Sequence, residues 1–419
     1  MITIYTSPEK ARLTPRHIEK TVKALQPRIQ EIKHVYADQT YEDSCSSINL
    51  GFDTDQHTTI KKRGEGYTCD ILIVVGIGGS NLGTLAVHEA LQTKLHNEIT
   101  NSTNVYFTDT THPKTIQSIQ EIIQKAQQEN KRVVVNAVSK SGGTTETIAN
   151  FELLTESLRQ ETNWFKDVVI TTTKNSDFDE YAKNNSIKTL YIPPSVGGRY
   201  SVFSAVGLFP LHILGINTDE LLRGSRDAVK KTLRGDEIVR SAAIKYLHIE
   251  KASHNTFLFD SDLESLGKWQ RQLVGESLGK EGKGVIPTVS IGSTDLHSVA
   301  QYYLGGENNT YHEFVEVDTY DSPVLPNRQE FENLVEDIQG IPLSKILSSI
   351  ISGVKTSFER QERPFTTNRL TQVDAYNIGW WMQYKMIETM LVGYMMDINP
   401  FNQPHVELYK DETRKLLRK

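Results

Sequence analysis

Short apolar runs alternate along the chain with longer segments in which apolar residues recur at helical spacing. The clearest run is Ile71–Val75, a continuous apolar stretch of the kind that predicts a strand buried on both faces. A helical pattern with Leu82, Leu85 and Leu91 follows it. Strands that alternate with helices in this way predict an α/β fold with a mainly parallel sheet between helices.

The same pattern recurs in both halves of the chain. Strands are predicted at 71–75, 104–107, 132–138, 168–172, 189–192, 255–259, 284–291 and 314–317, with helices at about 113–129, 269–280 and 373–391 and a charged helix at the C-terminus. Residues before Gly64 and Gly66 read as polar and helical. We therefore expect a helical N-terminal segment (1–66) and two tightly packed α/β units (67–225 and 226–419).

The predicted helix at 269–280 carries a carboxylate at an unusual place. Leu266, Trp269 and Leu273 form one apolar stripe, and Glu276 falls at its edge. One interpretation is a boundary glutamate whose carboxylate reaches solvent. The other is a general base held in a pocket, where partial desolvation makes a carboxylate more basic.

A glycine-rich turn follows the first strong strand, at 76–80. A dinucleotide-binding fingerprint would place its third glycine at position 81, which is Asn81, so that interpretation stays a minor alternative. The remaining interpretations are an anion-binding turn, with backbone N–H groups at Gly79 and the hydroxyl of Ser80, or a tight turn that merely requires glycine.

The stretch after the strand at 132–138 is the stronger phosphate signal. Ser139, Lys140, Ser141, Thr144 and Thr145 supply four hydroxyls and a cation beside two glycines. A phosphate monoester requires several donors that converge on its oxygens. The alternative is a helix cap formed by Thr145 or a neighbour, but a cap needs a single hydroxyl, so we favour phosphate.

Two further loops carry candidate chemistry. Arg199 follows Gly197 and Gly198, which allow a ligand to approach the backbone closely, and its guanidinium offers a fixed positive charge. The alternative is a surface arginine paired with a carboxylate. His297 lies beyond the strand at 284–291, at a carboxyl end where α/β sheets bind ligands, although a lone histidine is more often structural.

Composition narrows the class of protein. The chain has 419 residues, a net charge of -6 and no long basic run, which argues against binding to nucleic acid. Its two cysteines exclude a disulfide framework and favour a reducing compartment. We see neither a signal peptide, nor an apolar run long enough to span a membrane, nor histidines and cysteines at metal-ligand spacing. These features predict a cytoplasmic protein without a metal or membrane partner.

Six segments taken together and in order resemble the glucose-6-phosphate isomerase family. They are 75–80, 139–146, 197–201, 272–280, 295–297 and 399–410, and the resemblance covers nearly all of the chain from about residue 70. One position departs from the family pattern: His405 stands where the family usually has glycine. Such a change could alter the loop or add a titrating group near Lys410.

The resemblance implies two sugar-isomerase (SIS) domains, each a three-layer α/β/α unit, with the active site between them. It implies that Glu276 moves a proton between C2 and C1, that Arg199 stabilises the cis-enediol(ate), and that Lys410 and His297 open the sugar ring. It also implies that His297 comes from the second subunit of a homodimer. The positions that match substrate-binding residues of the family are Gly79, Ser80, Ser139, Lys140, Ser141, Thr144, Gly198, Gln272 and Gln403.

The implied activity is the reversible conversion of glucose 6-phosphate and fructose 6-phosphate, in glycolysis and gluconeogenesis, with no cofactor. A base that returns the same proton to the neighbouring carbon needs neither a metal nor a redox group. Two alternatives remain: a non-catalytic SIS-type protein that senses sugar phosphates, and a dinucleotide-dependent enzyme. The sensor would not need Glu276, Arg199, His297 and Lys410 together, and Asn81 disfavours the dinucleotide enzyme.

Overall fold

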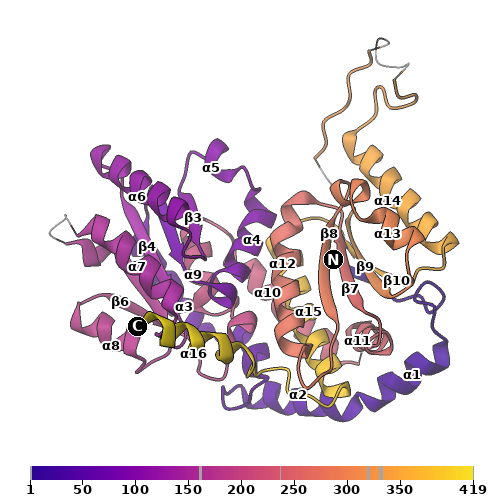
Figure 1. Ribbon diagram of the computed structural model, residues 1–419, viewed down its shortest axis with the longest axis horizontal. Helices are drawn as coiled ribbons and strands as arrows, with labels where there is room; N and C mark the ends of the chain where they lie inside the picture. The colour runs from indigo at the N-terminus through magenta and orange to yellow at the C-terminus, as the bar shows by residue number, and fades with distance from the viewer. Residues whose placement is uncertain are drawn as a thin grey trace.

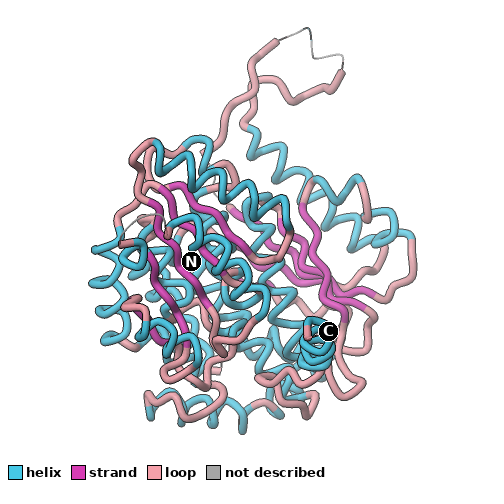
Figure 2. Tube along the Cα trace, turned by 60° about the vertical axis from the view of Figure 1, so that its left-hand side comes forward, coloured by secondary structure: helices cyan, strands magenta, loops and turns pink. Residues whose placement is uncertain are grey.

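The computed structural model describes residues 2–159, 163–235, 237–318, 321–328, 330 and 334–418. Two five-stranded sheets lie side by side, each between layers of helices (Figures 1 and 2). The expected pair of mainly parallel α/β/α units is thereby confirmed.

The first sheet is wholly parallel, with the strand order β3-β2-β4-β5-β6. Its strands are β2 (Ile71–Val75), β3 (Asn104–Thr108), β4 (Val133–Val138), β5 (Val168–Thr172) and β6 (Lys188–Tyr191). The sequence predicts β2 and β5 with these bounds and the other strands to within one residue at each end. Apolar runs locate β2, β4 and β5 well because these three strands are buried on both faces.

Alternate side chains of β2 enter two different layers of helices. Ile71, Ile73 and Val75 pack with α6 (Pro113–Gln128), α7 (Thr145–Leu158) and α8 (Asp177–Asn184). Leu72 and Val74 point the other way. The helices on that side are α3 (Thr54–Gly64), α4 (Leu82–Gln92) and α9 (Ala205–Ile213), and the short α5 (His96–Ile99) follows α4. The period of two along a strand therefore gives the three layers.

The second sheet has the order β1-β10-β9-β7-β8 and is parallel except at β1. Its strands are β1 (Ile2–Tyr5), β7 (Ser253–Leu258), β8 (Ile286–Ile291), β9 (Thr310–Val317) and β10 (Phe365–Leu370). One face packs against α11 (Glu237–Leu247), α12 (Glu264–Leu278) and α15 (Ala375–Met395), and the other against α13 (Ala300–Gly305) and α14 (Leu343–Arg360).

The N-terminal segment is mainly helical, as expected, but it begins with a strand. Ile2–Tyr5 form strand β1, which pairs antiparallel with β10 at the edge of the second sheet. The helices α1 (Pro15–Ala24) and α2 (Gln26–Asp38) then run along the bottom of the second unit in Figure 1. Helix α3 reaches the first unit, where it packs on α9. A four-residue strand with two buried isoleucines is too short to distinguish from a loop by its pattern.

Helix α10 (Thr218–Leu233) joins the two halves, so the boundary expected between residues 225 and 226 falls inside a helix. It packs closely along α15. A Cβ atom on Gly379 would lie 2.0 Å from the carbonyl oxygen of Leu221, so only glycine permits this helix crossing. Helix α16 (Val406–Leu417) ends the chain and lies beside the first unit.

Candidate active site

A cleft of about 1000 Å³ lies between the first unit, helix α12 and the C-terminal segment. From the first unit it is lined by the loops that follow β2, β4, β5 and β6. These loops meet at the carboxyl ends of parallel strands, which is where open α/β sheets bind ligands.

The turn after β2 touches the turn after β6. Gly78 has a φ of +58°, a conformation that favours glycine. A Cβ atom on Gly79 would lie only 2.2 Å from the carbonyl carbon of Gly198. The two turns, η3 (Gly78–Ser80) and η5 (Gly198–Tyr200), can therefore approach this closely only because residue 79 is glycine. Gly79, Ser80 and Gly198 all line the cleft.

The hydroxyl groups of the loop after β4 lie in two different surroundings. Lys140, Ser141 and Thr144 line the cleft, whereas Ser139 is 1% exposed. The Ser139 hydroxyl lies 3.2 Å from Thr144 Oγ1 and accepts a hydrogen bond from the backbone N–H of Gly142. Ser139 thus shapes the loop from behind.

Thr144 is the N-cap residue of α7, but its side chain makes no capping hydrogen bond. The hydroxyl cluster is therefore not explained as a helix cap. Burial and the positive charge of Arg199 lower the pKa of Lys140. No described carboxylate pairs with Lys140, so its donors remain available beside the N-terminus of α7, where an anion is favoured.

Arg199 connects helix α12 to the C-terminal segment. It is 2% exposed, and all five of its N–H donors find acceptors. Its guanidinium donates to Glu276 Oε2 at 3.2 Å and to Gln403 Oε1 at 2.8 Å. The remaining acceptors are Ser277 Oγ and the carbonyl oxygens of Pro400 and Asn402. The surface-arginine alternative does not fit these contacts.

Glu276 lies at the edge of the apolar stripe of α12, as its spacing predicts. Leu266, Trp269 and Leu273 are at most 1% exposed, whereas the Glu276 side chain is 26% exposed and lines the cleft. Gln272 Nε2 donates to Oε1 at 3.0 Å, and Arg199 donates to Oε2. Both oxygens are fixed while the carboxylate stays open to the cleft.

The C-terminal segment brings Gln403 and Lys410 to the same cleft. Lys410, on α16, forms an ion pair with Glu407 at 2.7 Å. His405 has a φ of -71° and an exposed side chain, so a residue other than glycine causes no backbone strain there. The departure from the family pattern leaves the path of the chain to Lys410 intact.

His297 is the one predicted catalytic residue that lies elsewhere. It is in the turn η7 (Thr294–His297) after β8, its side chain is exposed, and it does not line the cleft. This chain alone does not bring His297 to Glu276.

The sequence interpretation missed the loop at 173–176, which follows β5 and also lines the cleft. Within the cleft, Thr173 Oγ1 and Gln272 Oε1 are buried without a hydrogen-bond partner among the described residues. Buried polar atoms of this kind call for a missing partner. A run of polar residues directly after a buried strand is the signal that indicates this loop.

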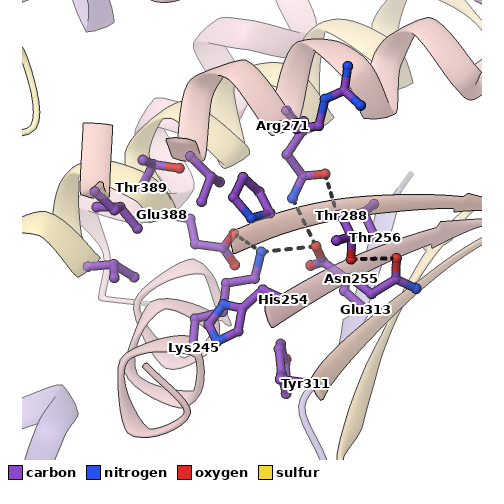
Figure 3. A pocket seen from close by; sticks show the side chains of 15 residues that line it. Lys245, His254, Asn255, Thr256, Arg271, Thr288, Tyr311, Glu313, Glu388 and Thr389 are labelled. Atoms are coloured by element: carbon purple, nitrogen blue, oxygen red, sulfur yellow. Dashed lines mark hydrogen bonds and ion pairs between the residues drawn. The ribbon is translucent and has the colours of Figure 1, made fainter. Parts of the chain in front are cut away.

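A second, much smaller cavity of about 20 Å³ lies beside another face of α12 (Figure 3). Next to it four buried side chains, the buried charge cluster, pair with one another: Lys245, Lys385, Glu313 and Glu388. Burial opposes the charge of Glu313, but the two lysines hold its pKa below the usual range. The space suits a water molecule and is too small for a sugar.

Among the described residues, no group of three or more His, Cys, Asp or Glu side chains is placed to hold a metal ion. None of the described helices has the length and apolar character that crossing a membrane requires.

Comparison with known proteins assigns the chain to a family. A family model described as phosphoglucose isomerase matches residues 56–312. Glucose-6-phosphate isomerase of Clostridium tetani is 31% identical over 425 residues, which cover 96% of this chain and 93% of the relative. The enzyme of that name from Rubrobacter xylanophilus is 33% identical and covers 80% of each chain.

Solved structures agree with this assignment at the level of the fold. A hypothetical protein of Thermus thermophilus has a TM-score of 0.87 at 26% identity, with 100% of both chains covered. A glucose-6-phosphate isomerase of Chlamydia trachomatis has a TM-score of 0.81 at 18% identity, over 97% of this chain and 87% of that one. On the family match and the identity to curated relatives, the chain belongs to the phosphoglucose isomerase family.

Proposed function

We propose that this protein interconverts glucose 6-phosphate and fructose 6-phosphate, in glycolysis and gluconeogenesis. The observation that carries the proposal is the position of Glu276. Its carboxylate is held by Gln272 and Arg199 at the wall of a cleft whose other side offers Lys140, Ser141 and Thr144. A base thus faces a set of anion donors across a sugar-sized space.

The phosphate group binds at the loop after β4 and does not react. Lys140 supplies a positive charge, Ser141 and Thr144 supply hydroxyl donors, and the N-terminus of α7 adds its partial charge. Ser80 contributes from the turn after β2. This binding energy fixes C1 and C2 of the opened sugar against Glu276.

Glu276 removes the proton from the carbon beside the carbonyl and returns it to the neighbouring carbon. Negative charge develops on the enediolate oxygens during this step. Arg199 stabilises that charge with a guanidinium that stays protonated throughout. Both electrons of the broken C–H bond stay in the substrate, and the proton returns to it from Glu276, so the reaction is an isomerisation that requires no cofactor.

Ring opening needs a proton delivered to the ring oxygen and another removed from a hydroxyl. Lys410 lines the cleft and supplies one of these groups. We propose that His297 supplies the other from a second copy of the chain, since it is exposed and outside its own cleft. The working enzyme is then a homodimer, which we place in the cytoplasm, built from the two SIS-type units.

A coupled assay tests the activity: fructose 6-phosphate is supplied and glucose 6-phosphate is measured by its subsequent oxidation. Chelator is present in the isomerisation step, and nicotinamide is added only afterwards. Product should form at a rate proportional to enzyme, and mannose 6-phosphate is tested alongside. Absence of glucose 6-phosphate contradicts the proposal and favours a sugar-phosphate sensor.

The dimer is tested by mixing two inactive variants, Glu276→Gln and His297→Ala, through unfolding and refolding. If His297 acts across the interface, each mixed dimer has one intact site, and random pairing restores about a quarter of the wild-type activity. If His297 acts within its own chain, every site carries one defect and activity is not restored.

A further inference from the structure

Lys280 has no role in the chemistry above, yet it lies close to it. It follows α12, four residues beyond Glu276, and is 5% exposed. Its ammonium donates to the carbonyl oxygens of Asn399 at 2.7 Å and Asn402 at 2.6 Å, and to Asn402 Oδ1 at 3.0 Å. All three donors are therefore directed at one short segment of chain.

Arg199 holds the same segment from the other side. Its Nη2 donates to the carbonyl oxygens of Pro400 at 2.7 Å and Asn402 at 3.2 Å. The carbonyl of Asn402 thus accepts from two buried cations. Burying an ammonium is costly unless it is well bonded, and charge-assisted hydrogen bonds are stronger than neutral ones. The segment is fixed more firmly than a surface loop requires.

The segment determines where the last catalytic groups lie. Gln403 follows Asn402 directly, and α16 with Lys410 begins three residues later. Residues 403–418 bury almost nothing of their own, since no residue of α16 is classed as buried. Apart from the hydrogen bond that Gln403 accepts from Arg199 at 2.8 Å, their position relative to Glu276 therefore depends on how the chain leaves residues 399–402.

We propose that Lys280 is a positioning residue. Its three hydrogen bonds to residues 399–402 hold Gln403 and Lys410 at the wall of the cleft, at the distance from Glu276 that the isomerisation requires. This inference rests on the proposed function. Lys280 touches no substrate and acts through the segment it holds.

The charge of the Lys280 ammonium gives the proposal a second test, the dependence of kcat on pH. Burial and the nearby Arg199 lower its pKa to about 8, while Glu281 and Glu276 oppose the shift. Residues 399–402 themselves carry no titratable side chain. A deprotonated amine has two N–H donors for three acceptors, so the hold on the segment weakens as the pH rises through this value.

The test compares three variants of the full-length protein. Lys280→Met keeps the side-chain length and removes the donors, and Lys280→Arg keeps a charge and donors. Lys283→Met is the matched control, because Lys283 lies three residues further on and donates to the carbonyl of Met396 at 2.9 Å. Each variant is assayed for kcat and KM with fructose 6-phosphate across pH 6.5 to 9.5.

Lys280→Met should lower kcat at least about 30-fold with KM within about threefold, because the phosphate loop is untouched and small misplacements of catalytic groups are costly. Lys280→Arg should restore most of kcat. It should also lack the fall in kcat that we expect of wild type as the pH rises through about 8. Lys283→Met should behave as wild type.

Two results overturn the inference in an enzyme whose wild type is active: unchanged kcat in Lys280→Met, or equal losses in Lys280→Met and Lys283→Met. If Lys280→Met does not fold, an alkaline limb in Lys280→Arg identical to that of wild type overturns it instead. An inactive wild type rejects the proposed function itself, so the two failures are distinguishable.

Discussion

Two groups of charged side chains surround helix α12, and only one of them is open to a ligand. In the buried charge cluster every charge finds its partner within the protein, and the adjoining cavity holds about 20 Å³. In the cleft, Lys140 has no described carboxylate partner, and Gln272 Oε1 is buried without a hydrogen-bond partner among the described residues.

This difference separates a structural use of charge from a functional one. The buried charge cluster joins α11, α15 and β9, and Gln270 of α12 donates to Glu313 at 3.2 Å. Through Gln270 it contacts the helix that carries Glu276, but it has nothing left to offer a substrate. The cleft keeps donors unused and a carboxylate partly exposed, at some cost in stability, as binding sites do.

The largest effect is expected at the base. Glu276→Gln keeps an oxygen for Arg199 but cannot accept the substrate proton, so kcat should fall about a thousandfold or more, within the range for a general base. The apparent affinity for fructose 6-phosphate, measured by calorimetry, should change little because the phosphate loop is intact. Turnover near that of wild type would remove Glu276 from its role.

The second-largest effect is expected in the buried charge cluster. Lys385→Met leaves Glu313 and Glu388 with a single lysine, and breaking a buried pair should lower the free energy of unfolding by about 3–5 kcal/mol. Urea unfolding followed by circular dichroism measures the loss, and kcat of the folded enzyme should stay close to wild type.

The exposed pair of Lys415 and Glu412 gives the matched control. Its removal by Lys415→Met should change the unfolding free energy by less than about 1 kcal/mol. If Lys385→Met proved as stable as this control, the buried charge cluster would not be what fixes this region of the second unit.

The third effect returns to the open cleft. Ser141→Ala combined with Thr144→Ala removes two donors from the phosphate, and at about 1.5 kcal/mol each KM should rise roughly 100-fold, with a smaller change in kcat. Thr155→Ala is the control on the same helix, because its hydroxyl donates to the carbonyl of Phe151 within α7. An unchanged KM in the double variant would mean that the phosphate binds elsewhere.

Periodicity predicted the strands that bury long apolar runs and missed β10, which buries polar residues. Strand β10 contains the polar residues Thr366, Asn368 and Arg369. All of its residues except Arg369 are buried. Its polar side chains are satisfied only by the neighbouring strand and helix, as where Asn368 donates to Glu313. The pattern that locates β2 is absent there, because tertiary hydrogen bonds replace apolar burial.

The candidate site likewise has parts that local sequence patterns indicate and parts that they do not. A stripe edge at Glu276 and a hydroxyl-rich loop at 139–145 are local patterns, so the sequence could indicate them. The bonds from Arg199 to residues 400–403, and those from Lys280 to the same segment, join positions more than a hundred residues apart. No spacing along the chain predicts such contacts, and only the family resemblance linked Arg199 to this site.

The smallest effect concerns the stability of the protein at acidic pH, and it arises from a histidine close to the buried charge cluster. His254, beside the small cavity, is buried and its Nε2 donates to the carbonyl oxygen of His248 at 2.9 Å, and burial lowers its pKa to about 3. An unfolded histidine takes up a proton near pH 6.5.

Between about pH 3 and pH 6.5, the unfolded chain therefore binds a proton at His254 that the folded chain does not. The free energy of unfolding should therefore fall by about 1.4 kcal/mol for each pH unit below about 6.5 on account of His254 alone.

His254→Gln removes this dependence while keeping an amide donor for the same carbonyl. Urea midpoints at pH 7, 6 and 5 should fall less steeply in this variant than in wild type, by about 2 kcal/mol in unfolding free energy at pH 5. His34→Gln, at an exposed position on α2, should keep the wild-type slope. An equal slope in His254→Gln and His34→Gln would show that protonation reaches His254 in the folded state, and that the region beside the buried charge cluster opens to water as the cleft does.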